Sequence, residues 1–259
     1  MTSGAPRTAD LEAEWARALK ILRIAPEIGL ACHVRPDADA LGSMLAVATA
    51  LRGAAQRDAG REVSIVASFG DHPFAVPATL AFLPGVGLLS PPGDFPRRPG
   101  VMMTFDAASP DRLGLLAASA GAADELIVLD HHAAGAGFGT VRLVDPAAPA
   151  TAVLARELIG RLGIPLTADI ALSLYAGLVT DTGSFKFSTT PRTHHLAAEL
   201  LGAGIDPGAV AHELFDRAPF GYLELLSAVL GRATLEPAGA GGLGLVWTCL
   251  LYTSPSPRD

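Results

Sequence analysis

Residues 28–43 read IGLACHVRPDADALGS and contain one complete unit of the fold that we predict for this chain. The run Ile28–His33 is almost continuously apolar, as strands buried on both faces of a sheet are. An acidic loop follows it, and helical spacing begins at Gly42 and continues to Arg52. A buried strand that leads through a polar loop into a helix indicates an α/β fold.

The same order of elements recurs further along the chain. Four more apolar runs have the length of buried strands: Val63–Ser68, Val101–Phe105, Leu126–Leu129 and Val141–Val144. Helical spacing covers Arg112–Ala120 and Thr151–Leu162. This alternation predicts right-handed crossovers and a mostly parallel sheet with helices on both faces. In such sheets the ligand binds outside the carboxyl ends of the strands.

The second half of the chain is mostly helical and indicates a division into domains. Ala168–Val179 has helical spacing, and the pairs Thr190-Pro191 and Asp206-Pro207 are each typical of a helix start. We expect a catalytic α/β domain over residues 1–187, a helical linker over 188–218 and the start of a second domain over 219–248. Residues 249–259 continue no earlier pattern, and we expect a non-native tail there.

The composition excludes several classes of protein. The 259 residues include 26 acidic and 19 basic side chains, which gives a formal net charge of −7. This charge argues against a protein that coats long nucleic acid, because such binding needs many basic residues on the phosphates. Cys32 and Cys249 are too few and too far apart for a disulfide framework. Because the N-terminal sequence lacks the pattern of a secretory signal and prolines interrupt the uncharged runs, we expect a cytoplasmic protein with no membrane partner.

Acids and histidines follow the ends of the apolar segments. The residues concerned are His33, Asp37, Asp39, Asp106, Asp130, His131, His132 and Asp181. If the sheet is parallel, the strand-end groups share one edge, and a single pocket could collect several carboxylates and imidazoles. Two like charges about 4 Å apart repel by about 4 kcal/mol at an effective dielectric near 20. Such a pocket therefore needs protonated acids or bound cations.

The mixture of oxygen and nitrogen ligands, without thiolate, favours Mn²⁺ or Mg²⁺ over a structural zinc ion. One acid can bridge two ions, and a metal pair of this kind activates water and holds both oxygens of an in-line phosphoryl displacement. Taken singly, each motif has a simpler interpretation, such as a solvated loop or a helix cap. The ordered combination is what indicates a metal site.

Several motifs together resemble a known family. LDHH at 129–132, preceded by HVRPDADALGS at 33–43 and followed by GLVTDTGSF at 177–185, is similar to the DHH phosphoesterase superfamily. Within it, FGTVRLVDPAAPAT at 138–151 and FKFSTTPRT at 185–193 resemble the bifunctional oligoribonucleases and 3′-phosphoadenosine 5′-phosphate phosphatases. The resemblance covers residues 28–193 and weakens after them.

The resemblance implies a centre of two divalent ions, with Mn²⁺ preferred and Mg²⁺ as the alternative. His33 and Asp37 would bind one ion, Asp106 would bridge, and the other ion would be held by Asp39, His131 and Asp181. The nucleophile would then be a metal-activated water, so no serine or cysteine nucleophile is needed.

The resemblance also implies roles beside the metals. Asp130 would orient a histidine, and His132 would contact the scissile phosphate, so that both join Asp106 as catalytic residues. Ser43 opens the helix behind the first motif, where free N–H groups favour anions, although it could equally be only a cap. Lys186 and Arg192 are candidates for contacts with substrate phosphates.

The implied substrates are short: oligoribonucleotides, linear or cyclic dinucleotides, and 3′-phosphoadenosine 5′-phosphate. One alternative is a family II-like inorganic pyrophosphatase, which shares the first motifs. Another is a non-catalytic nucleotide-binding module, because full-length relatives continue into a DHH-associated domain of which we expect only the start here. The glycine-rich segment 238–244 lacks the histidine of that domain's motif. The oligomeric state stays open, with a homodimer as one alternative.

Overall fold

The computed structural model describes residues 8–57, 62–133 and 137–248 of the chain. The expected tail at 249–259 therefore lies outside the described residues. The chain forms two compact units, Met1–Val210 and Ala211–Asp259.

The first unit is built on a parallel sheet. Its strands are β1 (Glu27–Cys32), β2 (Ser64–Phe69), β3 (Val101–Phe105), β4 (Glu125–Asp130) and β5 (Val141–Val144). Their order in the sheet is β2-β1-β3-β4-β5, and every pair of neighbours is parallel. The predicted α/β fold is thereby confirmed. The sheet brings the carboxyl ends of β1, β3 and β4 side by side.

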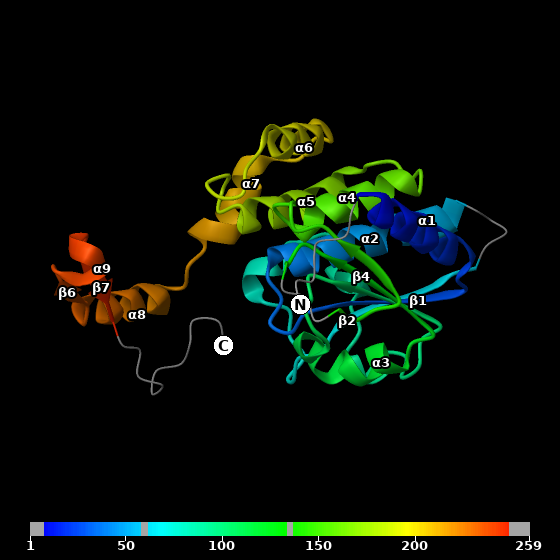
Figure 1. Ribbon diagram of the computed structural model, residues 1–259, viewed down its shortest axis with the longest axis horizontal. Coiled ribbons are helices and arrows are strands. Elements are labelled where there is room, and N and C mark those ends of the chain that lie inside the picture. Colours follow the sequence, from blue (N-terminus) through cyan, green and yellow to red (C-terminus); the bar gives the residue numbers. More distant parts are fainter. Residues whose placement is uncertain (1–7, 58–61, 134–136, 249–259) are drawn as a thin grey trace. The chain divides into compact units, whose positions relative to one another are not determined.

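Helices cover both faces of this sheet (Figure 1). One face carries α1 (Thr8–Ile24), α2 (Ala38–Arg57), α4 (Thr151–Arg161) and α5 (Ala168–Asp181). On this side α2 packs against β1, β2 and β3, and α5 packs against α2. The opposite face carries α3 (Ala117–Ala122). Because β1, β3 and β4 are buried on both sides, most of their residues are apolar, which explains the nearly continuous runs in the sequence.

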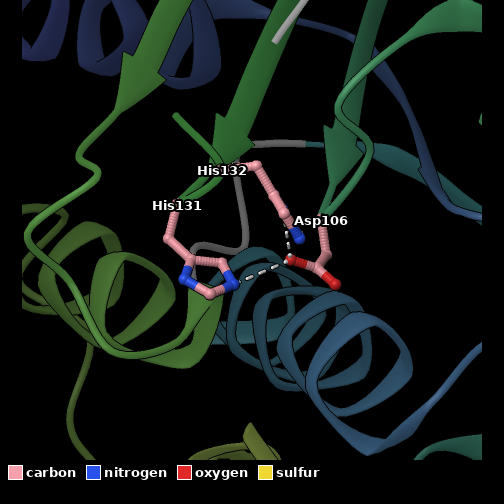
Figure 2. Close-up of side chains that lie close together, drawn as sticks. All are labelled: Asp106, His131 and His132. Carbon is pink, nitrogen blue, oxygen red and sulfur yellow. Dashed lines mark ion pairs between the residues drawn. The ribbon is translucent and has the colours of Figure 1, made fainter. Parts of the chain in front are cut away.

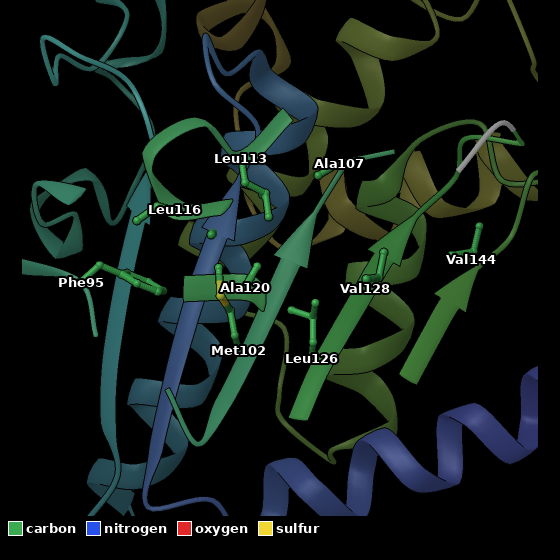
Figure 3. Packing of buried hydrophobic residues seen from close by; sticks show 10 residues of the cluster. Phe95, Met102, Ala107, Leu113, Leu116, Ala120, Leu126, Val128 and Val144 are labelled. Atoms are coloured by element: carbon green, nitrogen blue, oxygen red, sulfur yellow. The ribbon is translucent and has the colours of Figure 1, made fainter. Parts of the chain in front are cut away.

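Successive side chains along each strand point alternately into the core beneath α3 and into the core beneath α2. Met102 on β3 and Leu126 on β4 point toward α3, where Leu116 and Ala120 cover them (Figure 3). Residues one position along each strand face the other layer, since side chains alternate with a period of two. Both layers exclude water, so the carboxyl edge of the sheet is where polar groups can gather.

One predicted element is wrong. Instead of a single helix over Arg112–Ala120, the chain forms a 3₁₀ segment over Pro110–Leu116 and then the short α3. The break falls at Gly114, whose backbone has φ 52° and ψ −125°. This conformation suits glycine, because a β-carbon there would lie 2.4 Å from Val34 Cγ1.

Tertiary hydrogen bonds hold the broken segment in place. Leu115 N donates to Gly70 O at 3.0 Å, after β2. Val34 N, directly after β1, donates to Arg112 O at 2.8 Å. The segment thus fixes the loops that leave two neighbouring strands at the carboxyl edge.

The first unit also contains α6 (Pro191–Gly202) and all but the last residue of α7 (Pro207–Ala211). As predicted, Thr190 caps α6 and Pro191 is its first residue, and Thr193 completes a reciprocal capping box. A π-helical turn follows at His212–Asp216. None of the helices in the described part of the chain is long and apolar enough to cross a membrane.

The described part of the second unit is small. It contains α8 (Phe220–Gly231), β6 (Thr234–Glu236), α9 (Gly239–Gly242) and β7 (Leu245–Trp247). The two strands are antiparallel, and left-handed Ala240 and Gly241 make α9 a glycine-rich turn between them. Large apolar side chains stay exposed here, Phe220 at 74% and Leu243 at 91%.

Candidate metal centre

The chemically active side chains meet at the carboxyl edge of the sheet. His33 follows β1, Asp106 follows β3, and β4 ends at Asp130. Two helices bring further carboxylates to the same place: Asp39 lies in the first turn of α2, and Asp181 is the last residue of α5. The structure therefore gathers, around one point, residues up to 148 positions apart in sequence.

Asp106 lies at the middle of the cluster. One carboxylate oxygen, Oδ1, is 3.5 Å from His131 Nε2 and 3.5 Å from His132 Nδ1 (Figure 2). The other, Oδ2, is 3.5 Å from His33 Nε2. Asp106 has a left-handed backbone with φ 55°, which aspartate tolerates better than most residues. The Asp106 side chain is 4% exposed, so protein groups surround the carboxylate almost completely.

Two sets of possible ligand atoms lie around this carboxylate, which belongs to the first of them. Among the described residues, His33, Asp37 and Asp106 offer one set whose atoms lie within 4.8 Å of one another. Asp39, His131 and Asp181 offer a second set of the same kind. A third group of the same kind, Asp106, His131 and His132, shares Asp106 with the first set and His131 with the second. This geometry suits two cations with one acid between them.

Asp37 has two tasks at the start of α2. Its Oδ1 accepts hydrogen bonds from the backbone N–H groups of Asp39 at 3.1 Å and Ala40 at 3.0 Å, so it caps the helix. Its Oδ2 lies 3.7 Å from His33 Nε2. The cap holds the carboxylate against the cluster although its side chain is 47% exposed.

Asp39 is fully buried and depends on another helix. Its Oδ2 accepts from Thr151 N at 2.7 Å, and its Oδ1 accepts from Ala152 N at 2.9 Å. Ser43 Oγ donates to Oδ1 at 3.3 Å. Burial, with the charges of Asp106 and Asp181, raises the pKa of Asp39 well above its ordinary value.

Close packing of α2 and α5 brings Asp39 and Asp181 together. A β-carbon on Gly42 would lie 2.4 Å from Ser173 O, and one on Gly177 would lie 2.8 Å from Asp39 Oδ1. The two glycines therefore allow a helix separation that no larger residue permits. Gly177 is also one turn before Asp181 on the same helix.

Without a cation, the histidines balance the carboxylates by holding protons. Burial alone would lower the pKa of His33, but the Asp106 and Asp37 carboxylates outweigh it and raise this pKa to about 10. His131 behaves in the same way. Burial alone would lower its pKa, but three carboxylates outweigh this effect and raise the pKa to about 9, those of Asp181, Asp39 and Asp106. Metal ions compete with such protons for the same ligand atoms.

The ring orientations of the histidines fit metal ligation. His33 Nδ1 lies 2.8 Å from Val34 O and His131 Nδ1 lies 3.2 Å from Ala148 O, so each Nδ1–H can donate to a carbonyl. That arrangement frees Nε2 as a ligand. His131 Nε2 is buried and makes no hydrogen bond of acceptable geometry, although Asp181 Oδ2 is 3.0 Å away. A cation would satisfy a buried nitrogen that makes no hydrogen bond.

His132 is held differently from His131. Asp130, which is buried, accepts at Oδ1 from His132 Nδ1 at 2.7 Å and from its backbone N–H at 3.1 Å. The His132 side chain is 47% exposed. Because Nδ1 is engaged by Asp130, Nε2 is the ring atom left for a ligand.

Of the three candidate substrate contacts, Ser43 touches a member of the second ligand set, and Lys186 and Arg192 are exposed. Ser43 is buried in α2 and donates to Asp39, so its hydroxyl serves that carboxylate. Lys186 is exposed in the turn after Asp181. Arg192 is exposed at the start of α6, with its Nη2 3.6 Å from Glu157 Oε2. Thr151 also belongs to the site, although nothing in the sequence singles it out except that it ends the motif at 138–151.

The part of the chain that carries most of these site residues matches a known protein family. The model of the DHH family, N-terminal domain, matches residues 27–178. The chain belongs to the DHH family. That match contains the first motif, Asp106 and the DHH triplet itself, and it ends three residues before Asp181.

Curated DHH relatives match most of this chain. The protein named bifunctional oligoribonuclease and PAP phosphatase NrnA of Thermus thermophilus is 34% identical over 235 residues, which are 90% of this chain and 64% of that protein. The protein of the same name from Bacillus subtilis is 26% identical over 82% of this chain and 64% of its own length. The chain thus spans just under two thirds of these relatives.

The DHH fold is also found among solved structures. An exopolyphosphatase-related protein from Bacteroides fragilis superposes with a TM-score of 0.75 at 22% identity, covering 91% of this chain and 68% of that one. At this identity the likeness concerns the fold.

Proposed function

We propose that this chain is a two-metal phosphoesterase that hydrolyses short oligoribonucleotides or dinucleotides, 3′-phosphoadenosine 5′-phosphate, or both. The observation that carries the proposal is the pair of ligand sets joined by Asp106. One set contributes His33 and Asp37, and the other contributes Asp39, His131 and Asp181. The buried Nε2 of His131, which makes no hydrogen bond, supports the same conclusion.

The donor set favours Mn²⁺ over Mg²⁺. Imidazole nitrogens suit Mn²⁺ better than Mg²⁺, which prefers oxygen and retains its water. Divalent ions in such pairs lower the pKa of water and stabilise the charge of an in-line phosphoryl displacement. The chain's own contribution is to fix the ligands through the cap at Asp37 and the hydrogen bonds at Asp39.

His132 is the residue proposed to act on the substrate. Asp130 holds Nδ1 as a donor, so Nε2 can hydrogen-bond a phosphoryl oxygen or give a proton to the leaving oxygen. The contact with Asp130 also raises the pKa of His132, which favours the protonated, donating form. Asp130 acts as a positioning residue, because its carboxylate touches only His132 among these groups.

The size and charge of the substrate follow from two observations. The net charge of −7 offers no broad electrostatic grip on a long strand. Two cations would supply a local positive field that a short phosphate substrate needs. The names of the Thermus and Bacillus relatives support the substrate class.

Residues 219–248 fall within the second compact unit, which supports their place in a separate substrate-binding domain.

One panel of assays tests this proposal. The chain is incubated with a dinucleotide, 3′-phosphoadenosine 5′-phosphate, a cyclic dinucleotide and pyrophosphate, each with Mn²⁺, Mg²⁺ or a chelator. We expect Mn²⁺-dependent release of mononucleotide or phosphate, lost in Asp106→Asn and kept in His194→Ala, which is exposed on α6. Preferred cleavage of pyrophosphate would favour the pyrophosphatase alternative. Nucleotide binding without any turnover would favour the binding module.

A further inference from the structure

Thr151 touches two buried carboxylates of the cluster, those of Asp106 and Asp39. It is the first residue of α4 and is fully buried. Its hydroxyl donates to Asp106 Oδ1 at 2.8 Å, and its backbone N–H donates to Asp39 Oδ2 at 2.7 Å. These partners lie 45 and 112 positions away along the chain. One residue therefore ties α4 to β3 and to α2 at the same point.

The start of α4 has no local cap. Ala150 occupies the cap position and offers no side-chain acceptor. Two of the free N–H groups of the first turn, those of Thr151 and Ala152, are satisfied by the two oxygens of Asp39. A carboxylate from a distant helix thus caps α4, and the cap fixes the orientation of Asp39 at both oxygens.

The hydroxyl of Thr151 distinguishes the two oxygens of Asp106. It donates to Oδ1, the oxygen shared with His131 and His132, and leaves Oδ2 toward His33. The torsion that rotates an aspartate carboxylate is soft, so geometry alone does not hold the group in one orientation. Asp106 lies at a strand end with a left-handed backbone and needs such a restraint.

We propose that Thr151 is a positioning residue that orients Asp106 as the bridge between the two metal sites. This inference rests on the proposed metal centre but concerns a residue outside both ligand sets. Hydrogen bonds from neighbours to metal-binding carboxylates commonly set metal affinity. The threonine methyl group fills buried space, and the hydroxyl is the group that acts on the carboxylate.

Two substitutions separate the hydroxyl from the rest of the residue. Thr151→Val keeps the shape and the backbone N–H to Asp39 but removes the donor to Asp106. Thr151→Ser keeps the donor and removes only the methyl group. Thr193→Val is the matched control, because Thr193 is also a nearly buried helical threonine whose hydroxyl makes a cap bond, in α6.

The readout is Mn²⁺ binding to the whole chain by calorimetry, with the free energy of unfolding measured separately without metal. We expect Thr151→Val to weaken Mn²⁺ binding about 10- to 100-fold, with Thr151→Ser within about twofold of wild type. Thr193→Val should lower stability and leave Mn²⁺ affinity unchanged.

Equal Mn²⁺ affinity in wild type and Thr151→Val would overturn the inference, as would a loss in Thr151→Ser as large as that in Thr151→Val. Because binding is measured without substrate, a chain that binds Mn²⁺ but turns over nothing would refute the proposed activity and leave this test intact. A wild-type chain that binds no Mn²⁺ would refute both.

Discussion

Gly177→Ala is the substitution whose cost can be worked out most directly from the structure. The added β-carbon would lie 2.8 Å from Asp39 Oδ1 and 3.0 Å from Asp39 Cα, where ordinary contact begins at 3.4 Å. The carboxylate cannot move aside, since backbone N–H groups of Thr151 and Ala152 hold it. The helices must therefore separate by a few tenths of an ångström, or Asp39 must lose its hydrogen bonds.

The expected cost has two parts of opposite sign. Overpacking of a well-packed interior costs about 1–3 kcal/mol. Replacing glycine by alanine in a helix returns about 1 kcal/mol. Gly53→Ala in α2 is the matched control, because its β-carbon would meet nothing closer than 3.5 Å. Both variants gain the same amount from replacing glycine by alanine in a helix, so their free energies of unfolding should differ by the overpacking cost, about 1–3 kcal/mol.

Denaturant unfolding followed by tryptophan fluorescence measures this difference in the first unit. The chain contains two tryptophans, and Trp15 is buried on α1 whereas Trp247 belongs to the second unit. In a Trp247→Phe background, Trp15 reports on the first unit alone. Gly177→Ala should also weaken Mn²⁺ binding, and Gly53→Ala should not. If the two variants are equally stable and bind Mn²⁺ equally, the close approach of α2 and α5 does not position Asp39.

Further predictions concern the metals and the substrate. Mn²⁺ at about 100 times its dissociation constant should raise the free energy of unfolding of the first unit by about 2.7 kcal/mol per site, and Asp181→Asn should reduce that gain in the same denaturant unfolding experiment. His132→Gln should lower turnover about 100-fold while calorimetry shows unchanged Mn²⁺ affinity; a parallel loss of affinity would make His132 a ligand. Gly42→Ala should destabilise the chain more than Gly177→Ala in the same fluorescence assay, because its β-carbon would meet a backbone oxygen, Ser173 O, at 2.4 Å.

The sheet could be predicted because its signal is local. Runs such as Val101–Phe105 are apolar except at Thr104, and burial on both faces produces that pattern directly. The gathering of His33, Asp106 and His131 followed from a topological rule, since parallel strands end at one edge. The family resemblance added the grouping of these residues into two ligand sets.

The parts that sequence reasoning missed depend on contacts between distant segments. The helix expected over Arg112–Ala120 breaks at Gly114 because the segment bonds to the loops after β1 and β2, which no local pattern reveals. Thr151 looked like an ordinary helix start, yet its partners come from β3 and α2. For Ser43 the sequence predicts either an anion contact or a helix cap, whereas the side chain is buried in α2 and its hydroxyl donates to Asp39.

The number of Mn²⁺ ions bound per chain tests the shared role of Asp106 most directly. Equilibrium dialysis followed by metal analysis gives this number for wild type and for Asp106→Asn, in which asparagine keeps the shape and tolerates the left-handed backbone. We predict two ions per wild-type chain and weaker binding of both in the variant. One ion per wild-type chain at saturation, or two ions held equally well by Asp106→Asn, would contradict a centre bridged by this carboxylate.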